Sequence, residues 1–348
     1  MNHSGCHAII HSNCRQEGMV TEVKIYFAPL EGITGYIYRN AFYEFFGQGI
    51  DKYFTPFIAA AHGGDMKTRS LRDVLPENNR RLPIVPQILT NHAKDFTALR
   101  KQLNALGYGE VNLNLGCPYR TVVSKGKGAG FLARKEELEA FLEEIFRKCV
   151  EGEEISVKTR LGMERSEEFE EILSIYNQFP IKELIIHPRV QKEFYDGKPD
   201  RMVFAQALSG SVNPVCYNGD IFTKEDYIQV KAEFPQLNSV MMGRGFLVNS
   251  GLLQEILQDI KMTKEDFTAF HDRLYEDYHE LMGEDKNTLF KMKELWNYWQ
   301  YLFDVQGEAG KEKYLKKIRK AKTGAEYKST VKSMLKECEI SQIPCFGK

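Results

Sequence analysis

Residues 110–118 read EVNLNLGCP, in which Val111, Leu113 and Leu115 alternate with polar residues before a Gly-Cys-Pro turn. This alternation predicts a β-strand that ends at the turn. Longer amphipathic stretches, such as Lys135–Val150, predict helices between this strand and its neighbours. Seven further runs of four to six residues also predict strands: Lys24–Ala28, Tyr53–Phe57, Ile84–Leu89, Ile155–Thr159, Glu183–His187, Pro214–Asn218 and Ser239–Met242.

Eight strands that alternate with helices over about 230 residues are the pattern of a (β/α)8 barrel. A doubly wound open sheet is the alternative, because alternation alone does not distinguish a closed sheet from an open one. After about Leu257 the strand pattern stops, and the rest of the chain predicts a smaller all-helical domain. Its expected helices are Thr263–Met282, Lys286–Phe303, Lys311–Lys322 and Ala325–Glu337.

These patterns divide the chain into three parts. Residues 1–20 match no motif, and we expect them to be a disordered extension. Residues 21–257 form the predicted barrel, and residues 258–348 form the predicted helical domain.

The composition is that of an ordinary globular protein. Of 348 residues, 43% are hydrophobic and 27% are charged, which excludes wholesale disorder. There is no run of 18 uncharged apolar residues, and the first 20 residues lack the pattern of a secretory signal. Seven cysteines without a Cys-x-x-Cys pair favour reduced thiols. We therefore expect a cytoplasmic monomer with no membrane span and no bound metal.

Charge is unevenly distributed along the chain. The net charge is 47 − 48 = −1, yet residues 311–336 hold ten Lys or Arg and two acids, a local +8. The other 322 residues then sum to 37 − 46 = −9. This split is typical of an acidic body with a basic nucleic-acid-binding appendage, and equally of a solvated helix face.

In a (β/α)8 barrel the functional residues lie where the strands end. Polar residues or glycine follow almost every predicted strand, which predicts a ligand-binding rim. Glycine and Arg244 after the last two strands favour a phosphate site, although each short motif alone is also typical of an ordinary turn. The rim residues are Pro29, Leu30, Glu31, Gln87, Asn114, Cys117, Lys158, Arg160, His187, Arg189, Asn218, Gly219, Asp220, Gly243 and Arg244.

Three rim positions carry candidate chemistry. Cys117 lies in a turn, where a thiol with a pKa near ~8.5 is mostly protonated at neutral pH and can donate a proton; the alternative is a small core residue. Lys158 points either outward to an acid or inward to a ligand with electron-rich oxygens, because an unpartnered buried ammonium is costly. His187 is either a ligand contact or a core residue.

The stretch 112–118 (NLNLGCP), followed by Gly-x-Gly-Ala-Gly at 126–130, resembles the signature of the tRNA-dihydrouridine synthases. Five further motifs match the family in the same order: APLEG at 28–32, VKTRLG at 157–162, IHPR at 186–189, YNGD at 217–220 and MGRG at 242–245. The resemblance extends over about residues 24–253. Two departures are Thr55-Pro56-Phe57, where the family has a Thr-Glu-Met type of sequence in the uridine pocket, and Gly35, which replaces an acidic residue.

The resemblance implies a barrel that binds FMN and, with NADPH or NADH as reductant, reduces the C5=C6 bond of particular tRNA uridines. Cys117 would be the general acid that protonates C5 after hydride addition at C6. Asn114, Tyr195 and Arg160 would line the uridine pocket. The implied FMN contacts are Pro29, Leu30, Glu31, Gln87, Lys158, His187, Asn218, Gly219, Asp220, Gly243 and Arg244. The candidate tRNA-phosphate contacts come from the basic segment: Lys313, Lys316, Lys317, Arg319 and Lys320.

Two other functions compete with this one. An FMN barrel that reduces a free pyrimidine or an enone would share the flavin site, but it has no need of the basic segment. A catalytically inactive RNA-binding relative would not need Cys117, Lys158, Gln87 and His187, all of which are present.

Overall fold

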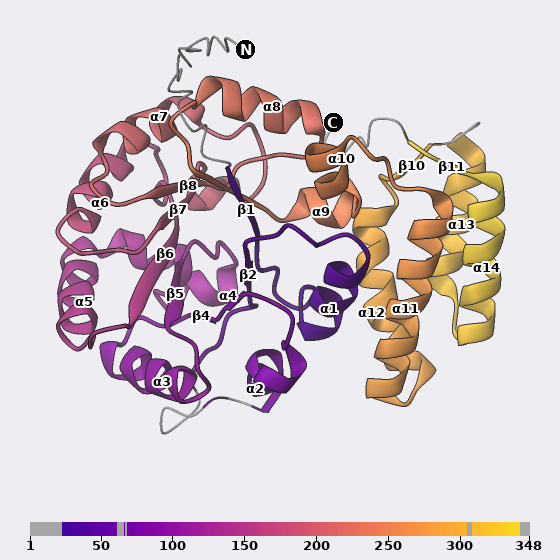
Figure 1. The fold of residues 1–348 in the computed structure, drawn as a ribbon, viewed down its shortest axis with the longest axis horizontal. Helices are drawn as coiled ribbons and strands as arrows, with labels where there is room; N and C mark the ends of the chain where they lie inside the picture. The colour runs from indigo at the N-terminus through magenta and orange to yellow at the C-terminus, as the bar shows by residue number, and fades with distance from the viewer. Residues whose placement is uncertain (1–22, 61–65, 67, 305–307, 342–348) are drawn as a thin grey trace, which may run out of the picture.

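The computed structural model describes residues 23–60, 66, 68–304 and 308–341. A parallel sheet surrounded by helices forms one part of the molecule, and the C-terminal helices pack beside it (Figure 1). The expected extension at residues 1–20 lies outside the described residues. No helix of the described chain is long and apolar enough to cross a membrane.

The main sheet is parallel throughout and has the order β3-β2-β1-β9-β8-β7-β6-β5-β4. Its strands match the eight predicted runs closely, apart from one that is split. They are β1 (Lys24–Phe27), β2 (Lys52–Phe54), β3 (Ile84–Val85), β4 (Gln87–Ile88), β5 (Glu110–Leu115), β6 (Glu154–Arg160), β7 (Leu184–His187), β8 (Val215–Tyr217) and β9 (Ser239–Met242).

The sheet closes into a barrel at residues 84–88. Pro86 has no N–H group and separates β3 from β4, which the sequence predicted as one strand. β3 pairs with β2, and β4 pairs with β5. The two ends of the sheet order are therefore neighbouring parts of one segment, so the nine short strands make an eight-stranded ring. The predicted (β/α)8 barrel is confirmed, and the open-sheet alternative is excluded.

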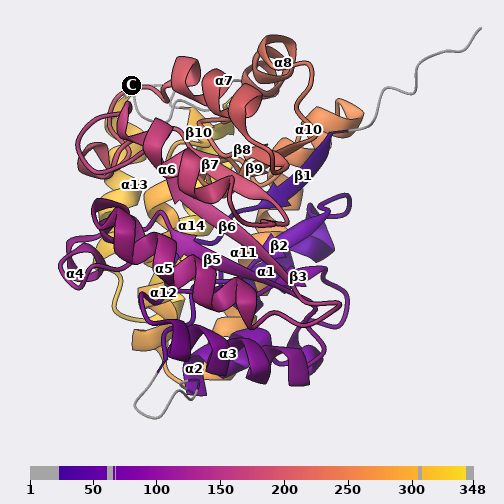
Figure 2. The same cartoon turned by 90° about the vertical axis from the view of Figure 1, so that its left-hand side faces the viewer.

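Helices cover the outside of this ring (Figures 1 and 2). Helix α5 begins where predicted, at Lys135, and ends at Arg147, three residues before the predicted end. The barrel helices are α1 (Tyr36–Phe45), α2 (Thr68–Val74), α3 (Ala93–Ala105), α4 (Arg120–Val123), α5 (Lys135–Arg147), α6 (Glu168–Tyr176), α7 (Arg201–Gly210), α8 (Lys224–Glu233), α9 (Arg244–Val248) and α10 (Leu252–Gln258).

Successive side chains of each strand point to opposite faces of the sheet, and the two faces contribute to two separate hydrophobic cores. Outward residues such as Ile25 and Phe27 join the large core beneath the helices. Inward residues form a small core in the barrel: Tyr26, Ala28, Phe54, Val85, Ile185, Cys216 and Met241. Side chains two positions apart share a face of a strand. Gln87, His187 and Asn218 therefore lie in the next layer above this apolar plug, nearer the strand ends.

The C-terminal region consists of α11 (Lys264–Met282), α12 (Asp285–Trp299), α13 (Glu308–Lys320) and α14 (Gly324–Glu337). All four helices were predicted. The second ends at Trp299 rather than residue 303, because Phe303–Asp304 forms a short strand, β10, that pairs with β11 (Glu339–Ile340). The helical domain thus carries a small antiparallel ribbon, which the sequence pattern does not predict.

Aromatic packing joins this domain to the barrel. Phe270 on α11 is fully buried and contacts α1 and α12. Its ring partners are Tyr38, Phe45, Phe46 and Trp299, at centroid distances of 5.8, 5.9, 5.2 and 6.2 Å. The two parts of the molecule therefore share one continuous core.

We expect Phe270→Ala to lower the free energy of unfolding by about 3–5 kcal/mol, because it leaves a cavity in this shared core. Urea unfolding would measure the change. Phe290→Ala, which removes a side chain that is 61% exposed, should change stability by no more than about 0.5 kcal/mol. Equal effects of the two substitutions would contradict this description of the interface.

Candidate active site

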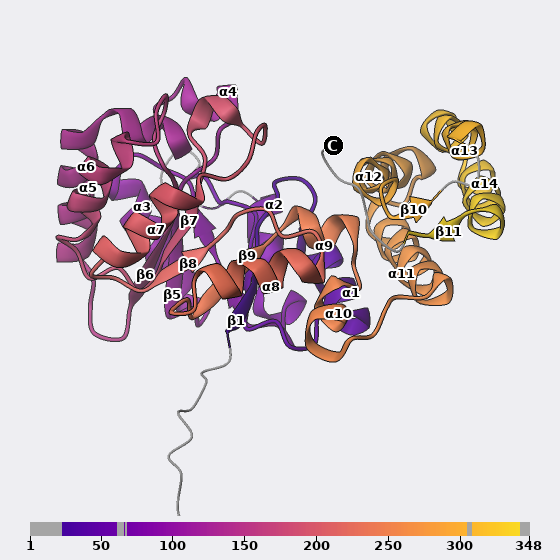
Figure 3. The ribbon, with the colours of Figure 1, turned by 90° about the horizontal axis from the view of Figure 1, so that it is seen from above.

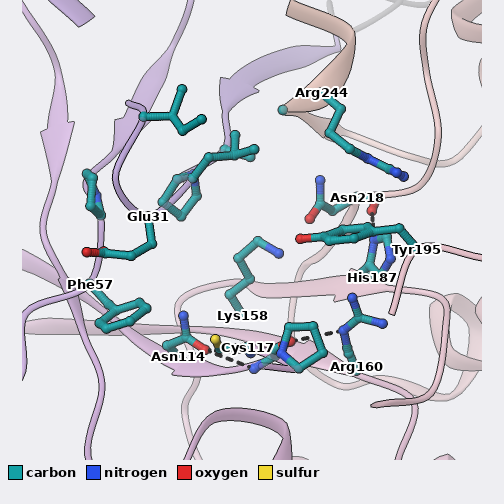
Figure 4. A pocket seen from close by; sticks show the side chains of 18 of the residues that line it. Glu31, Phe57, Asn114, Cys117, Lys158, Arg160, His187, Tyr195, Asn218 and Arg244 are labelled. Carbon is teal, nitrogen blue, oxygen red and sulfur yellow. Dashed lines mark hydrogen bonds between the residues drawn. The ribbon is translucent and has the colours of Figure 1, made fainter. Parts of the chain in front are cut away.

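A cavity of about 290 Å³ opens at the carboxyl ends of the barrel strands (Figure 4). The fifteen residues predicted to bind cofactor, bind uridine or act as the acid all line it. They come from β1, β4 to β9 and the loops that follow them: Pro29, Leu30, Glu31, Gln87, Asn114, Cys117, Lys158, Arg160, His187, Tyr195, Asn218, Gly219, Asp220, Gly243 and Arg244.

A chain of amide side chains forms one wall. Gln87 Nε2 donates a hydrogen bond to Asn112 Oδ1 over 2.8 Å, and Asn114 Nδ2 donates to Gln87 Oε1 over 2.6 Å. Asn112 Nδ2 in turn donates to Ser156 Oγ. Because each amide is fixed by its neighbour, the orientation of Gln87 and Asn114 is set before any ligand binds.

The same network positions the Cys117 turn. Asn114 Oδ1 accepts hydrogen bonds from the N–H groups of Gly116 and Cys117, at 3.1 and 2.9 Å. Gly128, with φ +56°, packs so closely under the turn that an added Cβ would lie 2.8 Å from the Cys117 carbonyl oxygen. The glycine-rich stretch at 126–130 therefore packs directly against the turn that carries Cys117.

Cys117 carries a protonated thiol at neutral pH. Burial raises its pKa above the ordinary value, and this outweighs the opposing effects of the Tyr119 N–H, Arg160 and Lys158. A half-buried, un-ionised thiol facing a cavity suits a proton donor better than a nucleophile.

Lys158 points inward and extends into the cavity between Cys117 and Arg244 (Figure 4). Burial, assisted by the neighbouring charge of Arg160, lowers its pKa to about 8. Among the described residues, its ammonium has neither a hydrogen-bond partner nor an ion-pair partner. Of the two alternatives for this lysine, the inward orientation toward a ligand is thus the one observed.

Arg160 holds the loops around the cavity. Its guanidinium donates to the carbonyl oxygens of Gly116 (2.9 Å), Val190 (3.0 Å) and Phe194 (2.5 Å), and it lies 5.3 Å from the Tyr195 ring centroid. The sequence predicts Arg160 only as a residue of the substrate pocket. Its contacts also make it a positioning residue that joins the cysteine loop to the loop after β7.

His187 is neutral. Burial, followed by the charges of Arg160 and Lys158, holds its pKa well below the ordinary value. The ring nitrogen Nδ1 lies 2.6 Å from the Asn218 carbonyl oxygen, so it carries the hydrogen and donates it there. Arg189 NH1 then donates to Nε2 over 3.4 Å.

An ion-pair group lies at the ends of β7, β8 and β9. The Asp220 carboxylate accepts from Arg189 NH2 at 2.5 Å and from Arg244 NH2 at 2.6 Å. The Arg244 guanidinium also covers the Tyr195 ring, 4.2 Å from its centroid. Asp220, predicted as a cofactor contact, therefore orients Arg244 in this structure. Arg189 was quoted in a motif, but its role in this group was not predicted.

Two cavity residues come from the helical domain. Glu294 and Tyr298, both on α12, face the barrel residues across the cavity. Lys291 on the same helix donates to the Gly32 carbonyl oxygen at 2.7 Å and pairs with Glu294 at 2.8 Å. A search of strand exits misses these residues, because nothing in the local sequence indicates that α12 packs over the barrel mouth.

The predicted basic contacts lie elsewhere. Lys313, Lys316, Lys317 and Lys320 line an open groove on α13 that is separate from the active-site cavity. Arg319 is also exposed, but it pairs with Glu312 and donates to Gln300. Metal-ligand groups of three or more His, Cys, Asp or Glu side chains are absent from the described residues.

Comparison with known proteins agrees with the motifs. A family model described as dihydrouridine synthase matches residues 26–339. The tRNA-dihydrouridine(16) synthase of Neisseria meningitidis serogroup B is 28% identical over 244 residues, covering 68% of this chain and 72% of the relative. A probable tRNA-dihydrouridine synthase of Staphylococcus aureus is 29% identical over 230 residues, covering 64% of this chain and 68% of the relative.

A solved structure of an NCR variant from Zymomonas mobilis covers 71% of this chain and 90% of its own, with a TM-score of 0.49 and 13% identity. The family model spans nearly the whole described chain, from the third residue of β1 to the first residue of β11. The protein is an enzyme, and it belongs to the dihydrouridine synthase family.

Proposed function

We propose that this enzyme reduces the C5=C6 bond of uridines in tRNA to dihydrouridine, with bound FMN and with NADPH or NADH as reductant. The proposal rests chiefly on one observation: the protonated thiol of Cys117 faces the same cavity as the ammonium of Lys158, which has no partner among the residues that the structure describes. The names of the two relatives above, both tRNA-dihydrouridine synthases, support the choice of tRNA.

The residues of the cavity fit FMN. The ammonium of Lys158, among the described residues, has no partner and suits the electron-rich edge of a flavin ring. Arg244 and the backbone after β8 and β9 suit a phosphate. Gly219 is needed in this backbone, because a Cβ there would overlap the Tyr217 hydroxyl. Ala28, Pro29 and Leu30 offer an apolar wall for the ring face.

When bound and reduced, FMN supplies the hydride equivalent that adds at C6 of uracil. Cys117 then donates its thiol proton to C5 of the resulting enolate and recovers a proton from solvent. Asn114 holds the loop that carries Cys117 and thereby sets the direction of proton transfer. The target base must leave the folded tRNA to reach this cavity, so it enters flipped.

Mapping dihydrouridine in tRNA from cells that lack this protein tests the proposal. At least one uridine that is reduced in the parent cells should remain unreduced, and the wild-type gene should restore its reduction. An unchanged dihydrouridine map, together with reduction of a free pyrimidine or enone by the purified protein, would favour the small-molecule alternative.

The first prediction concerns the flavin phosphate. Arg244→Ala should weaken FMN binding by about 1.5–3 kcal/mol, because it removes a charge-assisted hydrogen bond to the phosphate. Fluorescence titration of the apoprotein with FMN measures this. Arg147→Ala, on the exposed face of α5, is the matched control and should bind FMN normally. Normal affinity in Arg244→Ala would refute the phosphate assignment.

The second prediction concerns the acid. Cys117→Ala should keep its FMN and its reduction by the nicotinamide cofactor, yet lose roughly 10²–10⁴-fold in uridine reduction, the usual contribution of a general acid. Single-turnover formation of dihydrouridine in tRNA is the measurement. Cys149→Ala, which removes another half-buried thiol, should react normally.

The assignment of Cys117 as the acid also predicts how the rate of uridine reduction depends on pH. Because burial raises the Cys117 pKa, the thiol stays protonated through neutral pH, and the wild-type rate should fall only in alkaline solution. The Cys117→Ala variant should lose the part of this alkaline fall that comes from the thiol and keep the part that comes from Lys158, whose pKa is about 8. A wild-type rate in Cys117→Ala would exclude the thiol as the proton donor.

The third prediction concerns α13. Replacing its four groove lysines, Lys313, Lys316, Lys317 and Lys320, with Gln should weaken tRNA binding and flatten its salt dependence. The slope of the logarithm of the binding constant against the logarithm of the salt concentration should fall by up to about one unit for each phosphate interaction that the substitutions remove. The FMN content should not change. The control replaces four other exposed lysines with Gln: Lys94, Lys101, Lys231 and Lys261. If the two quadruple variants bind tRNA alike, α13 is only a solvated helix face.

A further inference from the structure

Exposed aromatic side chains gather at the mouth of the active-site cavity. Among the described residues, the exposed large aromatics are Tyr119, Phe194, Tyr195 and Phe290. The first three lie on the loops that follow β5 and β7, next to the cavity. Tyr195 is covered by Arg244. Tyr119 and Phe194 remain, 55% and 38% exposed, with no ring partner among the described residues.

The two loops form one surface because they are tied to each other. Arg160 donates to the carbonyl oxygen of Gly116 on the first loop and to that of Phe194 on the second. Gln191 Nε2 adds a hydrogen bond of 2.9 Å to the Pro118 carbonyl oxygen. Tyr119 and Phe194 therefore lie on two loops that these hydrogen bonds hold in a fixed position relative to each other.

Phe194 is held in an unfavourable backbone conformation. Its φ is 49° and its ψ is −92°, and only one other non-glycine residue of the described chain, Asp259, has a positive φ. This conformation costs free energy for a bulky residue, and such strain is concentrated at functional sites. Packing does not account for it, because the Phe194 side chain is exposed.

Positive charge accompanies the aromatics. From Pro118 to Lys135 the sequence holds five Lys or Arg residues and no acid. Arg134 and Lys135 pair with glutamates. Arg120 and Lys125 are exposed, and within the described chain they form no ion pair. Aromatic rings interleaved with unpaired cations are the pattern that binds single-stranded nucleic acid, with bases on the rings and phosphates at the cations.

We infer that Tyr119, Phe194, Arg120 and Lys125, together called the aromatic rim, bind the unpaired nucleotides that flank the target uridine of the RNA. The inference rests on the proposed function, since a flipped base in the cavity places its neighbours at the mouth. The rim lies beside α4 on the barrel, well away from α13 and α14 (Figures 1 and 3). It is thus a second RNA surface, distinct from the α13 groove.

The test measures binding of tRNA that lacks dihydrouridine to the FMN-loaded enzyme over a range of salt concentrations. Tyr119→Leu and Phe194→Leu keep an apolar side chain but remove the ring. Each should weaken binding roughly 5- to 150-fold, the range for one base–aromatic stack, with an unchanged salt slope. Arg120→Gln with Lys125→Gln should instead flatten the slope, by about 0.7 for each phosphate interaction removed.

Phe290→Leu is the matched control, because it removes an exposed ring on α12 that lies outside the two rim loops, and it should bind like wild type. FMN content should be unchanged in every variant, since none of the substituted residues is an expected FMN contact. Wild-type tRNA affinity in both Tyr119→Leu and Phe194→Leu would overturn the inference. A rim that binds a protein instead of RNA would give this same result. The proposed function fails separately, if wild-type enzyme forms no dihydrouridine in the same tRNA.

Discussion

Pro86 interrupts the segment at which the barrel closes, and the active site depends on that closure. Its carbonyl oxygen accepts from the Asn112 N–H at 2.8 Å, while the preceding residues pair with β2. One segment thus joins both ends of the sheet. Closure brings all the strand ends to one rim, and the next inward side chain, Gln87, enters the amide chain that sets the Cys117 turn. A sheet left open here would separate the predicted residues into two groups.

Above the apolar plug, cationic side chains cluster at the carboxyl ends of β6, β7 and β9. Lys158, Arg160 and Arg244 line the cavity, and Arg189 lies next to His187 and Asp220. The Asp220 carboxylate pairs with Arg189 and Arg244, and the other two acids of the lining are Glu31 and Glu294, of which Glu294 pairs with Lys291. Burial among these charges keeps His187 neutral and lowers the Lys158 pKa to about 8. Such a site is poised for an anionic ligand, whose binding would offset the mutual repulsion of the cations. The half-buried Cys117 thiol stays protonated, because burial raises its pKa by more than the neighbouring cations lower it.

Sequence periodicity was enough to predict the barrel and the inward residues, because strand alternation and strand exits are local properties. It missed features that depend on distant segments meeting. The pairing of Phe303–Asp304 with Glu339–Ile340 is one, and the arrival of Glu294 at the cavity from α12 is another. The contacts of Arg160 that bridge two loops were equally hidden, since they join the Gly116 carbonyl to those of Val190 and Phe194, which lie on a loop far along the chain. The roles of the individual site residues toward FMN and uridine stay predictions.

Electron transfer to RNA is the central claim, and one anaerobic experiment tests it directly. The FMN-loaded enzyme is reduced, freed of excess reductant and mixed with tRNA that carries no dihydrouridine, while the visible absorbance of the flavin is followed. Oxidised flavin should reappear and dihydrouridine should form in equal amount, whereas tRNA already reduced at its target should leave the flavin reduced. Flavin that stays reduced with the unmodified tRNA would contradict the account.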